Sequence, residues 1–390
     1  MANKRVVVIG GGPAGHDAAT YAARFGAEVT LVEREIVGGA AHLRDCVPSK
    51  SMIATGGALS FARRLDGMGL ANVETGVDAE HLRARIQGIE QRLEQSVTQL
   101  LTSQGVTIHR GTGRLLGPNE VCVDTPNGVI EITADAIVLA TGSRPRIPEW
   151  APIDHERVLT TRDAYPPEQI PDHLVVVGSG VTGVEFVHMF ASLGSEVTLI
   201  VSRQQVLPQK DPEAAALLEH NFLDRGVQLL KGARATEILR KGQSVTVHCS
   251  DGRIAQGSHA LLAIGSDPNS QGLGLENTDI AIDDDGYIQV DHNLRSSVPT
   301  IYAAGDLSGK LPLSSVAAMQ GRKIAEHIMG LHEGREHRHL DYDKAASAIF
   351  TEPEIADVGL AEAEAFATGR KIRVTKVPFS SNAKALINND

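Results

Sequence analysis

The chain has 390 residues, of which 42% are hydrophobic and 22% charged, enough apolar content for an ordinary globular core divided into two or three domains. Its net charge of −11 argues against nucleic-acid or anionic-membrane binding, since both require clustered positive charge. We therefore expect small-molecule partners and no nucleic acid.

Three cysteines lie far apart in the chain, at Cys46, Cys122 and Cys249. They predict neither a disulfide framework nor a site of paired metal-binding cysteines, and we expect no metal. The apolar run at residues 6–10 is too short for a signal peptide, and no stretch approaches membrane-spanning length. Together these features favour a reducing cytoplasm.

An apolar strand followed by a glycine turn and a helix is predicted twice. The first copy covers residues 6–15 and the second covers residues 175–183, and further strands follow at residues 27–33 and 195–201. The chain thus contains two βαβ openings.

Other segments mark the organisation of the chain. Apolar residues spaced by three and four predict an amphipathic helix at residues 81–104, whose apolar stripe faces the core. Proline-rich stretches at residues 144–152 and 165–171 predict a linker into the second copy. A strand and turn at residues 300–306 precede a predicted helix over residues 315–329.

The first glycine loop has the spacing of a dinucleotide-binding fingerprint. Gly10 permits the turn, Gly12 lets a pyrophosphate approach the backbone, and Gly15 lets the helix pack on the strand. The pyrophosphate then lies at the helix N-terminus, where free N–H groups and the helix dipole favour negative charge. Glu33 stands at the end of the following strand, where a ribose hydroxyl needs an acceptor, which argues against a chance turn.

The second loop, residues 178–183, has the same context but no acid at the corresponding strand end. Val201 occupies that position and is followed by Ser202 and Arg203. Without a carboxylate a 2′-phosphate is not repelled, and a nearby arginine can pair with it. This favours NADPH, or use of both NADPH and NADH, while a role of Arg203 as a solvated surface charge stays open.

Two dinucleotide sites on one chain have a simple chemical meaning. One dinucleotide stays bound as FAD, and the other visits as NADPH or NADH and delivers hydride to the flavin. The pair of loops therefore predicts an FAD-dependent oxidoreductase.

These residues, with the run from Gly38 to Lys50, closely resemble the pyridine nucleotide-disulfide oxidoreductases, the family of dihydrolipoamide dehydrogenase and glutathione reductase. Further motifs follow in the family's order: Ala140-Thr141-Gly142, Ala263-Ile264-Gly265, Ala303-Ala304-Gly305-Asp306 and the run from Phe350 to Gly359. The resemblance implies an α/β fold with two Rossmann-like domains, for FAD and for NAD(P), plus the start of an α+β interface domain. The implied boundaries are residues 1–150 and 273–341 for the two segments of the FAD-binding and central domain, 151–272 for the NAD(P)-binding domain, and 342–390 for the dimerisation domain.

By the same resemblance, residues of these motifs would hold the two dinucleotides. The implied cofactor-binding residues are Gly10, Gly12, Pro13, Ala14, Gly15, Glu33, Gly39, Ala40, Cys46, Lys50, Gly113, Thr141, Gly142, Gly178, Gly180, Val181, Thr182, Gly183, Glu185, Ser202, Arg203, Gly265, Gly305, Asp306, Leu313 and Ser314. Among them, Gly113 would lie by the adenine and Asp306 would bind the ribityl chain.

The resemblance assigns Cys46, Lys50 and Glu185 to catalysis. Lys50 would lie near flavin N5 and pair with Glu185. An ammonium group there stabilises a negatively charged reduced flavin, and a carboxylate keeps a buried lysine charged. A lysine on a helix surface and an ordinary acid near a helix start are the structural alternatives.

The chain departs from the family at the redox disulfide. The family relays electrons through a Cys-x-x-x-x-Cys pair, whereas Ala41 occupies the first position here, so Cys46 cannot close that disulfide. The resemblance implies that Cys46 still lies against the flavin, as a thiolate favoured by Lys50 or a helix N-terminus, while a passive packing role is equally open. Cys122 and Cys249 lie in alternating strand patterns and are expected to be structural.

A second departure concerns the end of the chain. Family members continue into a dimerisation domain that supplies a His-Glu pair to the partner's active site, whereas this sequence stops within that domain's opening strands. We expect a homodimer, although no residue here can be assigned the acid/base role. Four histidines lack an orienting carboxylate or metal-ligand spacing and are expected at the surface or at helix ends. These are His188, His332, His337 and His339.

Without the disulfide relay, electrons must leave the flavin directly for an acceptor. A quinone suits this task, because it is planar, accepts one or two electrons and needs no thiol chemistry. The Gly-Gly-Ala-Ala run ahead of the lone Cys46 is similar to a subgroup of actinobacterial NAD(P)H quinone reductases. Two alternatives stay open: a single-cysteine disulfide reductase or peroxidase that uses Cys46 through a sulfenic acid or a mixed disulfide, and a flavin-bound NAD(P)H sensor without catalysis.

Overall fold

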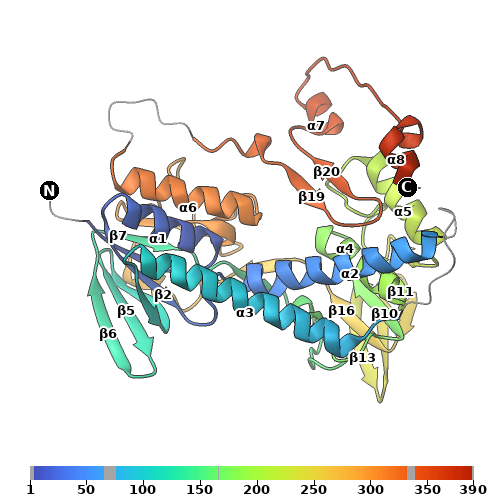
Figure 1. Ribbon diagram of the computed structural model, residues 1–390, viewed down its shortest axis with the longest axis horizontal. Helices are drawn as coiled ribbons and strands as arrows, with labels where there is room; N and C mark the ends of the chain where they lie inside the picture. The colour runs from blue at the N-terminus through green and yellow to red at the C-terminus, as the bar shows by residue number, and fades with distance from the viewer. Residues whose placement is uncertain (1–3, 66–75, 166, 332–338, 389–390) are drawn as a thin grey trace. The chain divides into compact units, whose positions relative to one another are not determined.

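Short apolar runs form two parallel sheets, one in each of two units of the chain (Figure 1). The computed structural model describes residues 4–65, 76–165, 167–331 and 339–388. Unit 1 consists of Met1–Pro48, Ile86–Arg146 and Gly265–Ala345, and unit 2 consists of Ser49–Arg85, Ile147–Ile264 and Ala346–Asp390. The domain boundaries expected from the resemblance stay predictions.

The sheet of unit 1 has five parallel strands in the order β18-β7-β1-β2-β3. Their bounds are β1 (Arg5–Ile9), β2 (Glu28–Glu33), β3 (Thr107–Arg110), β7 (Ala136–Leu139) and β18 (Ile301–Ala303). Val6 and Val8 of β1 face one side and Val7 and Ile9 face the other, and all four are buried in apolar clusters. Burial on both faces explains why these strands are continuous apolar runs rather than alternating ones.

Helices cover one face of this sheet and a second sheet covers the other. Helices α1 (Pro13–Arg24) and α6 (Ser314–Ile328) lie side by side (Figure 1), and small residues let them approach closely. At Gly321 of α6 a Cβ atom would come within 2.0 Å of the carbonyl oxygen of Ala14 in α1. The opposite face packs on an antiparallel sheet of β4 (Thr112–Gly117), β5 (Glu120–Thr125) and β6 (Gly128–Thr133).

Unit 2 repeats this architecture around the strand order β12-β11-β10-β16-β9. The strands are β9 (Val158–Thr160), β10 (His173–Val177), β11 (Glu196–Val201), β12 (Gln228–Lys231) and β16 (His259–Leu262). An antiparallel sheet covers one face and comprises β13 (Ala235–Lys241), β14 (Ser244–Cys249) and β15 (Ile254–Gly257). Helix α4 (Val181–Leu193) packs on β10 and β11, and α5 (Pro212–Asp224) packs on β12. The two βαβ openings predicted from the sequence are thereby confirmed.

The remaining elements connect or extend these sheets. They are η1 (Ala41–Cys46), α2 (Val47–Arg64), α3 (Ala79–Ser103), β8 (Ser143–Pro145), η3 (Thr161–Ala164), β17 (Ser266–Pro268), η4 (Leu275–Asn277), η5 (Gly305–Ser308), η6 (Tyr342–Lys344), β19 (Ser347–Ile349), β20 (Ile355–Asp357), α7 (Glu362–Ala367), η7 (Phe379–Ser381) and α8 (Ala383–Asn388). None of the helices in the described ranges is long and apolar enough to cross a membrane.

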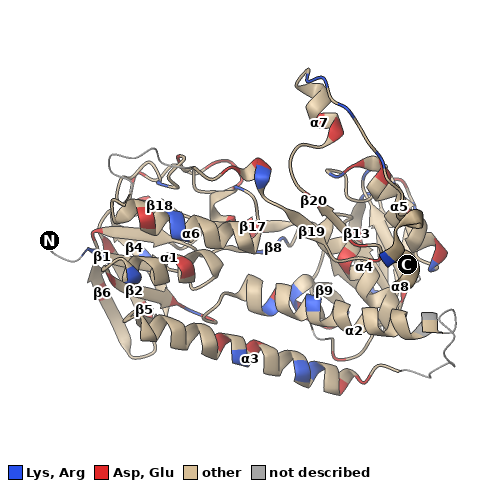
Figure 2. Ribbon diagram, turned by 45° about the horizontal axis from the view of Figure 1, so that its top comes forward, with Lys and Arg blue, Asp and Glu red and all other residues tan. Residues whose placement is uncertain are grey.

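The long helix predicted at residues 81–104 is confirmed as α3, and the one at residues 315–329 as α6. Charges of both signs lie along α3 (Figure 2), as expected for a helix that keeps one apolar stripe inward. The expectation of a plain linker at residues 144–152 is partly wrong, because Ser143–Pro145 forms β8 and pairs with β17. A two-stranded pair consists only of edge strands, where the missing N–H of Pro145 is tolerated.

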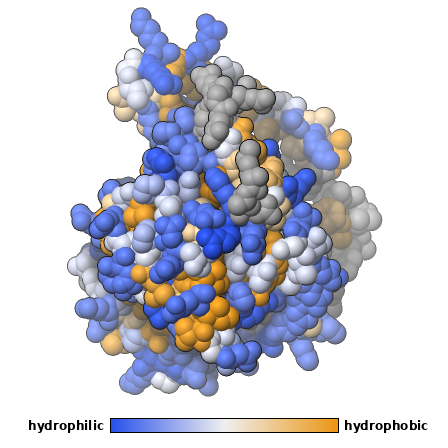
Figure 3. All heavy atoms as spheres, turned by 90° about the vertical axis from the view of Figure 1, so that its left-hand side faces the viewer, coloured by the Kyte–Doolittle hydropathy of each residue, from blue (hydrophilic) through white to orange (hydrophobic). Residues whose placement is uncertain are grey.

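Unit 1 exposes several apolar side chains. Val129 of β6 is 64% exposed, and Ile282 is 50% exposed. Figure 3 shows hydrophobic residues interspersed with hydrophilic ones on one face of the molecule. Such mixing is usual for protein surfaces and marks no binding site by itself.

Two of the three cysteines are core residues, as predicted. Cys122 in β5 is 1% exposed and Cys249 in β14 is 6% exposed. Burial raises the pKa of the Cys249 thiol, which keeps it in the unreactive protonated form.

The prediction that His188 lies at the surface or at a helix end is wrong, because it is only 2% exposed in the middle of α4. This helix is apolar on nearly all sides, so its one histidine is buried with the rest. Its Nδ1 accepts a hydrogen bond from Arg225 Nη1 at 2.9 Å, and Arg225 Nη2 donates to Ser192 Oγ at 2.8 Å. Burial, with Arg225 beside it, lowers the pKa of His188 to about 4. His339 is exposed, as expected, whereas His332 and His337 lie outside the described residues.

The buried neutral His188 predicts a pH-dependent stability. In the unfolded chain its pKa returns to 6.5, so the unfolded state binds the proton preferentially below that pH. The free energy of unfolding should therefore be undiminished above about pH 6.5 and fall by about 3 kcal/mol as the pH approaches 4. His188→Gln, which still offers Arg225 an acceptor, should flatten this dependence in urea unfolding followed by circular dichroism. His220→Gln, at an exposed position of α5, serves as the matched control; parallel pH curves for wild type and His188→Gln would contradict the assignment.

Candidate functional site

Most residues predicted to bind FAD gather at the carboxyl ends of the parallel strands in unit 1. Open α/β sheets bind ligands at this edge. The glycine loop follows β1, Glu33 ends β2, Ala140-Thr141-Gly142 follows β7, Gly305 and Asp306 follow β18, and Leu313 and Ser314 begin α6. Gly113 of β4 lies beside this edge, because a Cβ there would meet Ile9 and Val32 at 3.1 and 3.2 Å.

The three glycines of the first loop differ in what surrounds them. Gly10 has a φ of +104°, and a Cβ on it would lie 2.3 Å from the carbonyl oxygen of Ala140. A Cβ on Gly15 would lie 1.8 Å from the carbonyl oxygen of Gly10, whereas one on Gly12 would meet nothing closer than Gly39 Cα at 3.8 Å. The protein itself therefore requires Gly10 and Gly15, while Gly12 keeps a space open that a pyrophosphate can approach.

The start of α1 suits an anion. Its N-cap is Gly12, which offers no side-chain cap, Pro13 occupies the first turn, and that turn carries no acidic residue. The first N–H groups of a helix lack partners within the helix, and the helix dipole favours negative charge there. These residues fit the pyrophosphate of a dinucleotide, and Ala14 and Gly15 lie in the same turn. Gly39 faces the loop, since a Cβ on it would lie 2.4 Å from Gly12 Cα, and Ala40 follows it.

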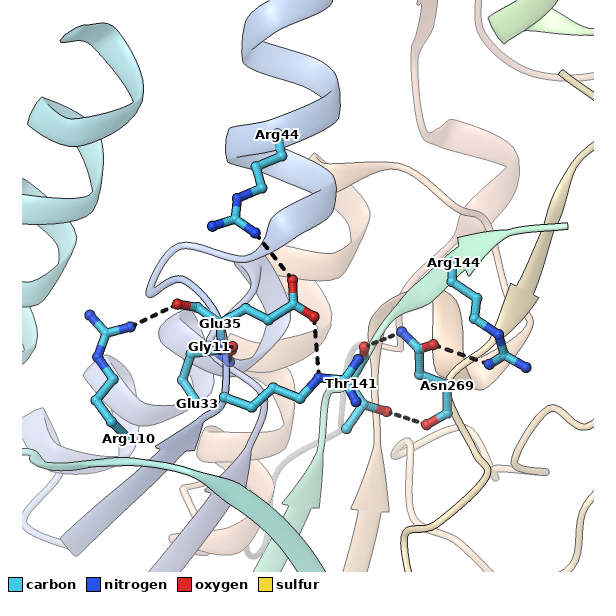
Figure 4. Close-up of polar contacts among 9 residues, drawn as sticks. Gly11, Glu33, Glu35, Arg44, Arg110, Thr141, Arg144 and Asn269 are labelled. Carbon is cyan, nitrogen blue, oxygen red and sulfur yellow. Dashed lines mark hydrogen bonds and ion pairs between the residues drawn. The ribbon is translucent and has the colours of Figure 1, made fainter. Parts of the chain in front are cut away.

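Glu33 is held in place by one backbone group of the glycine loop and by another, two residues further along the chain, and Figure 4 shows it with Gly11 and Glu35. Its Oε2 accepts from the Gly11 N–H at 2.7 Å, its Oε1 accepts from the Glu35 N–H at 2.7 Å, and the residue is only 8% exposed. Glu35 is in turn fixed by Arg44 at 3.4 Å and by Arg110, which donates to its carbonyl oxygen at 3.2 Å. Two backbone donors thus orient a carboxylate at the position where a ribose acceptor is expected.

Sequence reasoning missed residues that brace the same edge. Asn269 Nδ2 donates to the carbonyl oxygen of Thr141 at 2.9 Å, the hydroxyl of Thr141 donates back to the Asn269 carbonyl at 2.9 Å, and Arg144 donates to Asn269 Oδ1 at 3.2 Å (Figure 4). Ser143 Oγ donates to Asp306 Oδ2 at 2.6 Å. These bonds link residues more than 120 apart in sequence, so local patterns carry no signal for them.

The glycine loop of unit 2 has the same steric pattern. Cβ atoms on Gly178 and Gly183 would lie 2.3 Å from the Ala263 carbonyl oxygen and 1.9 Å from the Gly178 carbonyl oxygen, whereas one on Gly180 would meet nothing within 4 Å. Gly180 is the N-cap of α4, again without a side-chain cap and without an acid in the first turn, where Val181 and Thr182 lie. A second dinucleotide pyrophosphate fits here. The protein's two loops therefore share one physical design.

The strand ends after the two loops differ in charge. Val201 ends β11 at the position that Glu33 has in β2, and it is fully buried. Ser202 and Arg203 follow and are exposed. Gly265, which was also predicted to bind a cofactor, has a φ of +104°. Its carbonyl oxygen accepts a hydrogen bond from the Arg146 N–H at 3.0 Å.

The structure contains the lysine–glutamate pair that the resemblance implies. Within unit 2, Lys50 Nζ of α2 donates to Glu185 Oε2 of α4 at 2.8 Å. Glu185 is 7% exposed, and its Oε1 accepts the backbone N–H of Phe350 at 3.0 Å. Two donors, one on each oxygen, therefore fix the orientation of this buried carboxylate beside Lys50.

Cys46 is the last residue of the π-helical turn η1, and its side chain is exposed. Lys50 follows four residues later in the continuing helix, and residues at this spacing lie on the same helix face. Ala41 begins η1 and is half-buried. The described residues contain no group of three or more side chains suited to a metal ion.

A cavity of about 520 Å³ in unit 1 lies at the other edge of the sheet. Its lining includes Lys4, Asp135 and Thr300, which precede β1, β7 and β18. Several polar groups of the lining already have protein partners: Asp135 accepts from the Arg5 N–H at 2.8 Å, and the Tyr302 hydroxyl contacts His327 Nδ1 at 2.9 Å. This cavity lies at the amino ends of the strands, whereas the glycine loop follows the carboxyl end of β1. We therefore do not regard it as a dinucleotide site, despite its volume.

Two dinucleotide loops of matched geometry, with an ion pair between Lys50 and the buried Glu185, define an oxidoreductase that works with two dinucleotides. The profile of the pyridine nucleotide-disulphide oxidoreductase family matches residues 4–321, and the profile of that family's dimerisation domain matches residues 345–390. The chain belongs to this family, whose members bind FAD and use NAD(P)H.

Individual relatives resemble the chain over nearly its full length. The NAD(P)H dehydrogenase (quinone) of Mycobacterium tuberculosis H37Rv is 42% identical, over 98% of this chain and 79% of the relative. A dihydrolipoyl dehydrogenase of Bacillus subtilis is 32% identical, over 98% of this chain and 82% of the relative. The crystal structure of LpdA from M. tuberculosis is similar with a TM-score of 0.93 and 40% identity, over 99% of this chain and 84% of that one. The chain therefore has the glutathione reductase-like fold predicted from the sequence.

The steric contrast within the second loop predicts different effects for two alanine substitutions. Gly180→Ala should leave thermal unfolding unchanged, because the new methyl group meets no protein atom within 4 Å. It should raise the KM for NAD(P)H about 5- to 100-fold, the effect of a close steric conflict with the pyrophosphate. Gly183→Ala, with its Cβ 1.9 Å from a carbonyl oxygen, should lower the unfolding temperature as well. A normal KM in Gly180→Ala would show that the loop does not receive the dinucleotide.

Proposed function

We propose that this protein passes two electrons from NAD(P)H through FAD to a quinone, without an intramolecular redox disulfide. The observation that carries the proposal is Ala41, which stands where the family's first redox cysteine would be. The sequence has no cysteine at the family's spacing before Cys46, so this chain cannot close the family's redox disulfide. The name of the 42% identical M. tuberculosis relative supports a quinone as the acceptor.

Bound FAD would accept a hydride from NAD(P)H and release two electrons to the acceptor. In total, NAD(P)H, one proton and a quinone become NAD(P)⁺ and a quinol, so atoms and electrons balance. The residues proposed to hold FAD are those of the first loop, with Glu33 and Asp306, and those proposed for NAD(P)H are those of the second loop.

Lys50 and Glu185 are the proposed catalytic residues, and Cys46 is proposed to lie against the flavin without being required for quinone reduction. The Lys50 ammonium would lie against the flavin and offset negative charge there, as the family resemblance implies. Glu185 limits the movement of that lysine through the 2.8 Å ion pair. Cys46 supplies an exposed thiol on the same face of the helix as Lys50.

We further propose a homodimer in the cytoplasm. The match of residues 345–390 to the family's dimerisation domain supports the dimer. The spacing of the three cysteines supports a reducing compartment.

An acceptor screen with the purified FAD-loaded protein tests this function. We expect NAD(P)H-dependent reduction of a naphthoquinone such as menadione, and little turnover of lipoamide or glutathione disulfide. Cys46→Ser should keep most of the quinone activity, because hydride and electrons would pass without thiol chemistry. Lipoamide turnover equal to that of the quinone would overturn the proposal. Complete loss of quinone reduction in Cys46→Ser with FAD still bound would favour the single-cysteine enzyme instead.

The strand end after the second loop predicts the choice of nicotinamide. Val201 does not repel a 2′-phosphate, and the exposed Arg203 can donate to it. Arg203→Ala should therefore raise the KM for NADPH about tenfold or more and leave the KM for NADH unchanged. Steady-state kinetics with both nucleotides measure the ratio, and Arg234→Ala, at another exposed arginine of unit 2, is the control. An unchanged NADPH to NADH ratio in Arg203→Ala would assign that side chain to the solvated surface.

A further inference from the structure

Phe350 contacts both members of the Lys50–Glu185 pair. Its backbone N–H donates to Glu185 Oε1 at 3.0 Å, and the centroid of its ring lies 4.9 Å from Lys50 Nζ. The other carboxylate oxygen, Glu185 Oε2, accepts from Lys50 at 2.8 Å. The three residues come from α2, α4 and the segment after β19, and together they form one polar and aromatic cluster within unit 2.

Side chains alternate in direction along the chain, so Phe350 does not point into the hydrophobic core that its neighbour Ile349 enters. Ile349, the last residue of β19, is 1% exposed, whereas Phe350 is half-buried. Successive side chains of an extended segment point to opposite sides, so Ile349 supplies the apolar anchor and the ring of Phe350 points elsewhere. A ring in this position, beside an ammonium group, is not explained by core packing.

Contacts on both sides of Phe350 fix its position. Ser347 and Asp357 pair across β19 and β20, and Lys210 Nζ contacts both, at 2.9 Å from Ser347 Oγ and 2.6 Å from Asp357 Oδ2. Two residues after Phe350, Glu352 Oε2 accepts from Ser60 Oγ of α2 at 2.7 Å. The β19–β20 hairpin is therefore held by contacts at the Ser347–Asp357 pair and at Glu352 between its strands. These contacts keep the ring of Phe350 beside Lys50.

We propose that Phe350 is a positioning residue for the reaction, which holds the Lys50 ammonium by a cation–π contact while its backbone N–H orients Glu185. The proposal rests on the proposed role of Lys50 at the flavin. Lysine has a long flexible side chain, and that of Lys50 is 37% exposed, so the ion pair alone leaves it room to move. The aromatic face attracts the cation from a second direction and narrows its range.

Replacement of the ring by an aliphatic side chain tests the proposal. Phe350→Leu removes the aromatic face but keeps apolar bulk and the N–H that binds Glu185. In the FAD-loaded protein we expect slower flavin reduction by NAD(P)H, by about 2- to 30-fold, the range that a cation–π contact represents. The KM for NAD(P)H should stay the same, and the midpoint potential of the flavin should become more negative. Amine labelling of Lys50, resolved by mass spectrometry, should become faster because the side chain is less restrained.

Matched variants separate positioning from a general structural effect. Phe350→Tyr keeps the ring and should give wild-type values in all four measurements. Phe366→Leu changes an exposed aromatic residue of α7 in the same region and should alter none of them. Should Phe350→Leu not fold, Phe350→Met carries the same expectation. Unchanged Lys50 labelling and potential in the aliphatic variants, or equal losses in Phe350→Tyr, would overturn the proposal.

The labelling and potential measurements do not depend on the electron acceptor. If quinone reduction is absent while Phe350→Leu still frees Lys50 and shifts the potential, the proposed acceptor is wrong and the positioning role stands. If quinone reduction is strong and these two quantities do not move, the positioning role fails and the proposed function stands.

Discussion

Both units depend on one steric constraint, the contact between the start of a helix and the turn that leads into it. In unit 1 the third glycine of the loop lies so close to the first that a Cβ would be 1.8 Å from a carbonyl oxygen, and in unit 2 the distance is 1.9 Å. Neither helix can take its place on the sheet with a side chain at that position. The middle glycine has no such constraint in either unit. The protein's own packing thus explains the first and last glycines of each loop. The middle glycine, Gly12 or Gly180, is explained only by a ligand that approaches the backbone there.

The strand ends beside the two loops differ in charge, although the loops share one design. In unit 1 a buried carboxylate, Glu33, is held by two backbone N–H groups beside the loop. In unit 2 the apolar Val201 stands there and is followed by exposed polar residues. An oriented carboxylate gives directional recognition of a ribose, whereas an open, positively charged strand end tolerates a 2′-phosphate and a ligand that must leave after each turnover. The chemical division between a resident and a visiting dinucleotide is consistent with this difference.

Periodicity and glycine spacing were sufficient for the two βαβ openings, the loops and helix α3, because each of these is encoded within a short run of residues. Sequence reasoning failed where burial or partners depend on distant segments. His188 was expected at the surface, although the apolar residues all around α4 were a signal that the whole helix is buried. Asn269 and Phe350 contact residues more than 100 positions away, so only the folded chain reveals them. The ion pair of Lys50 with Glu185 was anticipated solely through the family resemblance, since no spacing rule relates α2 to α4.

The loss of the family's first redox cysteine affects only one part of the helical segment that carries Lys50. Ala41 and Cys46 bound η1, whereas Lys50 lies in α2 and is held by contacts to α4 and to the segment after β19. None of these contacts uses a thiol. A different residue at position 41 can therefore remove the disulfide relay without disturbing the contacts of Lys50 with Glu185 and Phe350. This separation of the two sets of contacts gives a physical reason why a chain of this family can lack the disulfide and still keep the lysine–glutamate pair.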